Sequence, residues 1–302
     1  MKSTTQSQTT ATSFASWAKF SRTKFSRTAL VLLLGIILSV ASASAAPIVY
    51  VVTVTQQFGT LDLASGQFHA IGNGTPDALS NLVWWKGSLL TVTITGANIG
   101  SLAKINPATG EETIIGQTGL GFNIFDLAAV RGKLYVTDLS NNIYSVDPDT
   151  GVATPITATG MPPDPTIPFT FNNDGTFNLC DEGLYNVGGK LYATFDSFAL
   201  DPAPSPPTIA HLHVAPALYQ IDPATGAATF IAHTDLNLTA LVAIQGKFYA
   251  FKGILDGFDS TFDFPIAHAE LVTLNLATGQ TRKLTDLDPS LGIILGAAPV
   301  RR

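Results

Sequence analysis

The sequence predicts an all-β fold, a five-bladed β-propeller whose blades are four-stranded antiparallel sheets. Three observations predict it. One turn motif recurs five times, a second turn motif alternates with it, and each end of the domain supplies one strand that an otherwise incomplete blade lacks. Four-stranded units repeated in tandem are the blades of β-propellers. We expect one propeller domain over residues 47–302, preceded by a targeting segment over residues 1–46.

The first motif has the form LYQIDPATGAATFIAH at residues 218–233, where a polar turn ending in Gly separates two β-rich runs. Asp or Asn opens the turn and Gly supplies a positive φ at its end, so each copy is a β-hairpin. Asp222 and Thr225 are therefore turn residues and not a catalytic pair, because sister copies carry Asn and Ser at these places. The turn glycines are Gly66, Gly110, Gly151, Gly226 and Gly279.

The second motif joins an apolar strand to an aromatic-rich strand across a tight turn, as in DLAAVRGKLYVTD from Asp126. This pattern is also typical of a β-hairpin. Because each motif contributes two strands, one unit of the repeat contains four strands. The turn glycines of this motif are Gly87, Gly132, Gly189 and Gly246.

One unit lacks the hairpin of the second motif, and the two ends of the domain provide its strands. Residues 291–300 have the pattern of a first strand, and residues 47–55 have the pattern of a second strand. We expect these strands to pair, because their pairing closes the ring of five blades and leaves no exposed sheet edge.

The N-terminal segment has the order of features of a secretory signal peptide. Basic residues in a long polar lead precede the apolar run 29–40, and the small residues Ala43-Ser44-Ala45 follow as a cleavage signal. The apolar run is shorter than the roughly 20 residues of a spanning helix, so we expect no membrane span in the mature chain. The sequence thus predicts a secreted or periplasmic protein.

The charge of the predicted domain argues against nucleic acid as a partner. Five of the 16 Lys and Arg lie in the N-terminal segment, which leaves 11 against all 22 Asp and Glu. Phosphate binding needs a basic face, and the remaining basic residues do not cluster beyond the pairs Arg282-Lys283 and Arg301-Arg302. The single cysteine, Cys180, cannot form an internal disulfide, so the domain must rely on a large core. We expect a monomer.

The LYVTD sequence at residues 134–138 and the DPATG-type turns resemble the YVTN and quinoprotein-like repeats of secreted bacterial propellers. The resemblance covers residues 47–302 and implies the propeller fold. It implies no particular activity, because this group has many functions. The tryptophan docking pattern of quinoprotein blades is absent, since the domain contains only Trp84 and Trp85. We therefore expect no quinone cofactor.

The order of strands separates two faces of the propeller. Both turn motifs connect strands at one end of each blade, which we name the short-turn face. Three insertions, residues 159–181, 198–216 and 252–269, fall at the opposite end, which we name the insertion face. Insertions between repeats usually build a binding surface, so the insertion face is the predicted working face.

Each insertion holds candidate ligand-binding residues. The first contains NNDGT, which suits either an ordinary turn or part of a calcium loop that lacks its final Glu. In the second, His211 and His213 form half of a zinc site if they lie on a strand, or the edge of a solvated loop otherwise. In the third, Asp259, Asp263 and His268 accompany three Phe residues, which suits sugar binding or a small hydrophobic cluster. Apart from these weak signs of calcium or zinc, we predict no cofactor.

The mouth of the central channel offers a second set of candidates. Asn81, Asp126 and Asp181 share one strand parity, whereas Ser80, Glu182 and Thr239 have the other. Only one parity can face the channel unless a β-bulge intervenes. The alternative role of these residues is structural, as caps of strand starts or as partners of buried water.

Three functions agree with the sequence. We favour a non-enzymatic binding or scaffold module that holds a protein or glycan partner on the insertion face. The alternatives are a hydrolase or lactonase with carboxylates at the channel mouth, with or without a metal, and a structural protein of the cell envelope. Conventional catalytic motifs are absent. An enzyme would need at least three of the channel and histidine candidates to converge.

Overall fold

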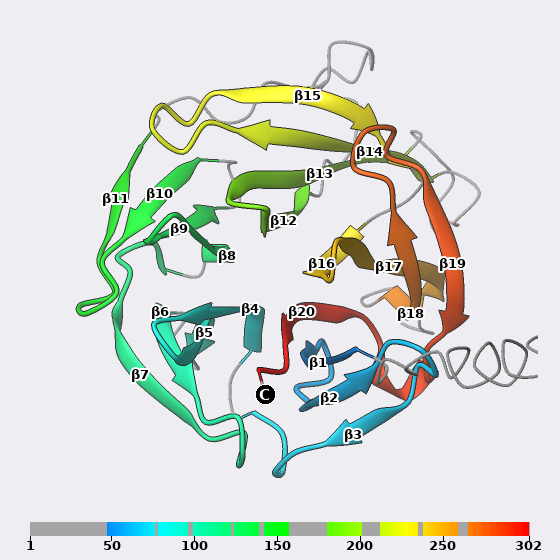
Figure 1. The fold of residues 1–302 in the computed structure, drawn as a ribbon, viewed down its shortest axis with the longest axis horizontal. Coiled ribbons are helices and arrows are strands. Elements are labelled where there is room, and N and C mark those ends of the chain that lie inside the picture. The colour runs from blue at the N-terminus through cyan, green and yellow to red at the C-terminus, as the bar shows by residue number, and fades with distance from the viewer. Residues whose placement is uncertain are drawn as a thin grey trace, which may run out of the picture. The chain divides into compact units, whose positions relative to one another are not determined.

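The computed structural model is a five-bladed β-propeller, which confirms the predicted fold class (Figure 1). Five four-stranded antiparallel sheets stand in a ring, and the first strand of each blade lines the centre. No helix in the described residues has the length and hydropathy of a membrane span. The described residues are 47–75, 78–95, 99–121, 124–138, 142–156, 180–200, 212–234, 238–258 and 265–301.

The strands of each blade are given from the centre outward. Blade 1 consists of β4 (Ala78–Trp85), β5 (Ser88–Thr95), β6 (Ile99–Ile105) and β7 (Glu112–Gln117). Blade 2 consists of β8 (Ile124–Val130), β9 (Lys133–Asp138), β10 (Ile143–Val146) and β11 (Ala153–Pro155). Blade 3 consists of β12 (Cys180–Val187), β13 (Lys190–Leu200), β14 (Leu212–Ile221) and β15 (Ala228–His233). Blade 4 consists of β16 (Leu238–Ile244), β17 (Lys247–Phe258), β18 (Pro265–Leu274) and β19 (Thr281–Asp286).

The fifth blade combines the two ends of the domain, as the sequence predicts. It consists of β20 (Ile294–Pro299), β1 (Ile48–Thr53), β2 (Phe58–Asp62) and β3 (Phe68–Ala70), and a short 3-10 helix, Pro289–Leu291, precedes β20. In the β20–β1 pair Val49 lies opposite Pro299, and the N–H of Val300 donates to the carbonyl oxygen of Ile48 at 3.0 Å. The ring therefore closes through backbone hydrogen bonds between strands from opposite ends of the domain.

The turns have the geometry that the two motifs predict. In the second motif both central residues are left-handed, for example Arg131 with φ 47° and Gly132 with φ 78°, which suits a two-residue hairpin turn. In the first motif the opening Asp or Asn accepts from the backbone two residues on, at 2.9 Å from Asp222 to the N–H of Ala224. This confirms the structural interpretation of Asp222.

The hydrophobic core lies between the blades. Each of the five buried clusters combines side chains from two neighbouring blades, as where Ala128 and Tyr135 of blade 2 pack with Leu191 and Tyr219 of blade 3. Neighbouring sheets pack face to face around the ring, so side chains on both faces of each blade are buried. The core thus fixes the angular position of each blade.

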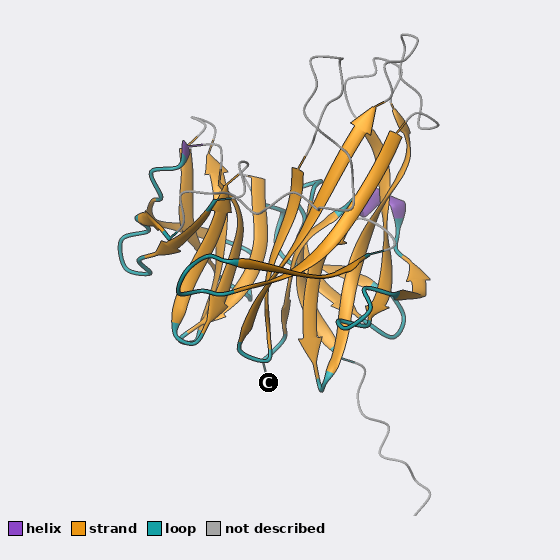
Figure 2. Cartoon of the chain, turned by 90° about the horizontal axis from the view of Figure 1, so that it is seen from above, coloured by secondary structure: helices purple, strands orange, loops and turns teal. Residues whose placement is uncertain are grey.

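Two of the predicted insertions, residues 198–216 and 252–269, continue the strands of their blades, which the sequence did not predict. The pairing of β13 with β14 continues to Leu200 and Leu212, and the pairing of β17 with β18 continues to Phe258 and Pro265. These four strands have 10 to 12 residues, against 4 to 8 for the corresponding strands of blades 1 and 2. Their ends rise above the ring on the insertion face (Figure 2).

We name the outer parts of these hairpins the blade-3 ribbon and the blade-4 ribbon. The blade-3 ribbon comprises residues 198–200 and 212–216, and the blade-4 ribbon comprises residues 253–258 and 265–269. Among the described residues, the pairing of β12 with β13 ends at Ser197, and the pairing of β16 with β17 ends at Lys252. The ribbons therefore extend beyond the innermost strands. The segment 157–179, most of the first insertion, lies outside the described residues.

Candidate functional site

Asn81 lies in the central channel and connects three of the innermost strands. A β-bulge between Ser80 and Val83 and a φ of 38° at Asn81 turn this side chain toward the channel. Its Nδ2 donates to the carbonyl oxygens of Leu127 and Leu184, both at 2.9 Å, and its Oδ1 accepts from the N–H of Leu82 at 2.8 Å. The amide thus joins β4 to β8 and β12.

Asp126 lies next to Asn81 and serves the same strands. A bulge between Ile124 and Leu127 places it, and only 2% of its surface is exposed. Its Oδ1 accepts from the hydroxyl of Ser80 at 2.9 Å, and its Oδ2 accepts from the N–H of Leu184 at 2.7 Å. Both carboxylate oxygens therefore bind groups of neighbouring blades.

Further side-chain bonds continue around the channel. The hydroxyl of Tyr185 donates to the carbonyl oxygen of Leu238 at 2.9 Å, which joins β12 to β16. The hydroxyl of Thr239 donates to the carbonyl oxygen of Ile294 at 2.7 Å, which joins β16 to β20. Together with Asn81 and Asp126 these residues form what we name the channel belt.

The channel belt also includes Ser80 and Trp84, and the hydrogen bond of Trp84 connects the last pair of innermost strands. The indole Nε1 of Trp84 donates to the carbonyl oxygen of Pro299 at 2.7 Å, which joins β4 to β20. Every pair of neighbouring innermost strands is thus connected by at least one side-chain hydrogen bond. In a buried channel such bonds satisfy backbone groups that would otherwise lose their contact with water.

Residues of both strand parities face the channel, because β-bulges interrupt the innermost strands. Ser80 and Asn81 are adjacent in sequence, and both contribute to the channel belt because the bulge in β4 separates them. A bulge between Leu238 and Ala240 places Thr239 in the same way. The hydrogen bonds of Asn81 and Asp126 favour the structural alternative for these two candidates.

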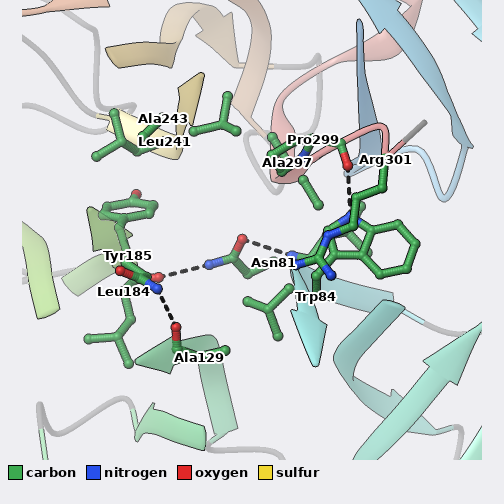
Figure 3. A pocket seen from close by; sticks show the side chains of 15 residues that line it. Asn81, Trp84, Ala129, Leu184, Tyr185, Leu241, Ala243, Ala297, Pro299 and Arg301 are labelled. Carbon is green, nitrogen blue, oxygen red and sulfur yellow. Dashed lines mark hydrogen bonds between the residues drawn. The ribbon is translucent and has the colours of Figure 1, made fainter. Parts of the chain in front are cut away.

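A cavity of about 190 Å³ lies in the channel, and Figure 3 shows the side chains that line it. It lies on the side of the short-turn face, because its lining includes Trp84 and Asn186, which shortly precede turns of the second motif. Ala129, Ala243 and Pro299 contribute to its wall at the ends of the innermost strands. At its rim the guanidinium of Arg301 lies 4.9 Å from the ring centre of Trp84, a cation–π contact. Sequence reasoning missed this cavity, because Ala residues and backbone carbonyls carry no recognisable motif.

A second cavity, of about 830 Å³, lies on the same face between blade 4 and the closing blade. Pro47 and Leu63 contribute from the closing blade, and Tyr249 and Leu276 contribute from blade 4. Short turns surround it, so the cavity is a groove between blades and not part of the predicted working face.

Several candidates cannot be placed at the level of side chains. Asp181 and Glu182 lie on β12, opposite Asp196 and Phe195, and His213 lies on β14 opposite Ala199; of their side chains nothing is described. His211, Asp259 and Asp263 lie outside the described residues. The backbone of His213 lies on β14, so the interpretation of this residue as part of a loop edge is wrong for its backbone.

His268 lies on β18, the third strand of blade 4, and not in the channel. Its Nε2 is 4.0 Å from Oδ1 of Asp286, and the Nζ of Lys283 lies 2.5 Å from the same oxygen. The hydrogen bond from Lys283 lowers the pKa of Asp286, and the same bond raises the pKa of Lys283. Of the candidates with described side chains, the structure brings together Asn81 and Asp126 and places His268 elsewhere.

No protein-family model and no curated protein matches the chain. Among solved structures it is similar to an exo-1,5-α-L-arabinanase from a bovine ruminal metagenomic library, at 12% identity and a TM-score of 0.47, over 78% of this chain and 91% of that one. It is also similar to an α-L-arabinofuranosidase from Clostridium thermocellum ATCC 27405, at 12% identity and a TM-score of 0.48, over 77% and 84%.

A protein of unknown function from Bacteroides thetaiotaomicron VPI-5482 is similar at 14% identity and a TM-score of 0.43, over 78% of this chain and 56% of that one. These similarities assign no activity to the chain.

Proposed function

We propose that this protein is an exported, non-catalytic binding module that holds a partner on the insertion face, through the blade-3 and blade-4 ribbons. The observation that carries the proposal is the extension of two neighbouring hairpins beyond the ring. The signal-peptide pattern of residues 1–46 supports export.

The composition of the ribbons favours a polypeptide over a glycan as the partner. Phe198, Leu200 and Leu212 are part of the blade-3 ribbon, and Ile254 and Ile266 are part of the blade-4 ribbon. Apolar residues at such density suit a protein interface. Each ribbon also has strand edges without a ladder partner among the described strands, and an extended peptide can add to such an edge.

The channel belt argues against Asp126 as a catalytic carboxylate. A catalytic carboxylate must reach the proton or atom that it attacks. Asp126 is 2% exposed, and its two oxygens accept hydrogen bonds from Ser80 and Leu184. This arrangement suits a residue that stabilises the ring.

The experiment places a photo-reactive amino acid on each face in cells that export the protein. Ala199 and Ile266 carry it on the ribbons, and the exposed turn residues Ala108 and Ala224 carry it on the short-turn face as controls. We expect a discrete cross-linked protein from the ribbon positions alone. Equal cross-linking from both faces would contradict the proposal.

A shortened variant tests the blade-4 ribbon directly. Residues 255–267 are replaced by Asn-Gly, which forms a two-residue turn between the paired residues Ile254 and His268. We expect this variant to fold and to lose the cross-link. A glycan that raises the unfolding midpoint of the wild type but not of the shortened variant would show that the partner is a sugar and not a protein.

A further inference from the structure

The outer half of blade 4 gathers one imidazole, two carboxylates and one ammonium group on a single face of its sheet. His268 and Glu270 are two residues apart on β18, so they share a face. Asp286 on β19 is the direct strand partner of Glu270. Lys283 is three residues from Asp286 on β19, so in a regular strand the two side chains would lie on opposite faces. A bulge in the β18–β19 pairing, between Leu271 and Val272, brings Lys283 to the same face as Asp286.

The ligand atoms of His268, Glu270 and Asp286 converge. One atom from each of the three lies within 4.8 Å of the other two. The ammonium group of Lys283 already lies between the carboxylates, with its Nζ 2.6 Å from Oε1 of Glu270 and 2.5 Å from Oδ1 of Asp286. The fold therefore holds two carboxylate oxygens around a cation, with the imidazole of His268 beside them.

We propose that His268, Glu270 and Asp286 form a binding site for a zinc-type divalent cation, and that the Lys283 ammonium group competes with the metal for the two carboxylates. An imidazole with two carboxylates suits zinc, which accepts nitrogen and oxygen ligands in a tetrahedral arrangement. Calcium and magnesium prefer sets of oxygen ligands alone. Three protein ligands leave the fourth position to water.

Charge and exposure permit the exchange of the two cations. The side chain of Lys283 is 47% exposed, so its ammonium group can move into water when a metal enters. The side chain of Glu270 is 15% exposed, and a divalent ion would neutralise both carboxylates together. The site lies where the blade-4 ribbon leaves the four-stranded sheet, but its existence does not depend on the proposed partner.

The test is titration of the purified full-length chain with zinc by calorimetry, together with the absorption spectrum of its cobalt complex. Lys283→Met removes the competing charge and keeps most of the stem, so we expect it to strengthen zinc binding about tenfold. Glu270→Gln and Asp286→Asn should each weaken zinc binding about tenfold or more. His268→Gln should also remove the nitrogen contribution from the cobalt spectrum, and thermal unfolding reports whether each variant folds.

His69, an exposed histidine on β3, provides the matched control. His69→Gln should leave zinc affinity unchanged. The proposal is wrong if neither the wild type nor Lys283→Met binds zinc more tightly than about 1 mM. It is also wrong if zinc binding persists unchanged in folded Glu270→Gln and Asp286→Asn proteins, since the metal would then lie at other residues.

Discussion

Asn81 and Asp126 together hold both polar backbone atoms of Leu184. Nδ2 of Asn81 donates to its carbonyl oxygen at 2.9 Å, and Oδ2 of Asp126 accepts from its N–H at 2.7 Å. Two polar residues that could have marked a catalytic channel thus connect the innermost strands of blades 1 and 2 to that of blade 3.

Replacement of Asn81 by Ala should destabilise the protein strongly. The carbonyl oxygens of Leu127 and Leu184 lose a buried donor, and the expected loss in the free energy of unfolding is about 3 kcal/mol. Asn186→Ala is the matched control, because Asn186 of blade 3 also donates to a carbonyl oxygen of a neighbouring blade, that of Ala129 in blade 2, but is exposed, and the expected loss is about 1 kcal/mol. Urea unfolding measures both, and equal losses would contradict the role of the channel belt.

The carboxylate of Asp126 should be replaceable by an amide. In Asp126→Asn the amide oxygen can accept from Leu184 and the NH₂ group can donate to the hydroxyl of Ser80, so the expected loss is about 1 kcal/mol. In Asp126→Ala the buried N–H of Leu184 and the half-buried hydroxyl of Ser80 lose their acceptor, and the expected loss is about 3 kcal/mol. A large loss in the Asn variant, comparable with that of Ala, would indicate that the negative charge itself is required.

The turn glycines of the first motif should be less replaceable than those of the second. Gly151 and Gly132 have nearly the same φ, 79° and 78°, so Ala at either position carries about 1–2 kcal/mol of backbone strain. At Gly151 an added Cβ would lie 2.5 Å from the carbonyl oxygen of Gly116 in the preceding blade, whereas nothing lies within 4 Å at Gly132. Thermal unfolding should show a larger loss for Gly151→Ala, and equal losses would contradict a contact between blades at this turn.

The Asp-capped turns should make stability fall in acid. The backbone N–H groups of Asp149 and Thr150 lower the pKa of Asp147 below its usual 3.8. Because the folded pKa is the lower one, the stabilisation is fully present above the unfolded pKa and is lost as the pH falls through the folded pKa. Asp147→Asn keeps the cap, as Asn106 does in its sister turn, so its urea midpoint should fall less steeply between about pH 4 and 2. Parallel curves for the two proteins would contradict this assignment.

The repeats made the architecture predictable from the sequence, because each turn needs Gly at a fixed place and each blade repeats the same two hairpins. Closure of the ring also followed, since residues 291–300 and 47–55 were the strands that one blade lacked. The ribbons were missed because Pro216, Gly253 and Gly257 interrupt the strand pattern there.

The detail of the channel was not predictable for a different reason. The bulge that separates Ser80 from Asn81 lies in an eight-residue strand that has no Gly or Pro to mark it. The partners of Asn81 in other blades are backbone carbonyls, which leave no trace in residue identity. The contact of Lys283 with Asp286 was also not predictable, because a bulge in the β18–β19 pairing places the two side chains on one face.

The most direct test of the account compares partner cross-linking from Ala199 in two variants, below the unfolding midpoint of each. The account predicts that the chain with residues 255–267 replaced by Asn-Gly keeps its unfolding midpoint and loses the cross-link. It predicts that Asp126→Ala has a lowered midpoint and keeps the cross-link. A folded Asp126→Ala protein that no longer cross-links, beside a shortened chain that still does, would contradict it and place the function in the channel.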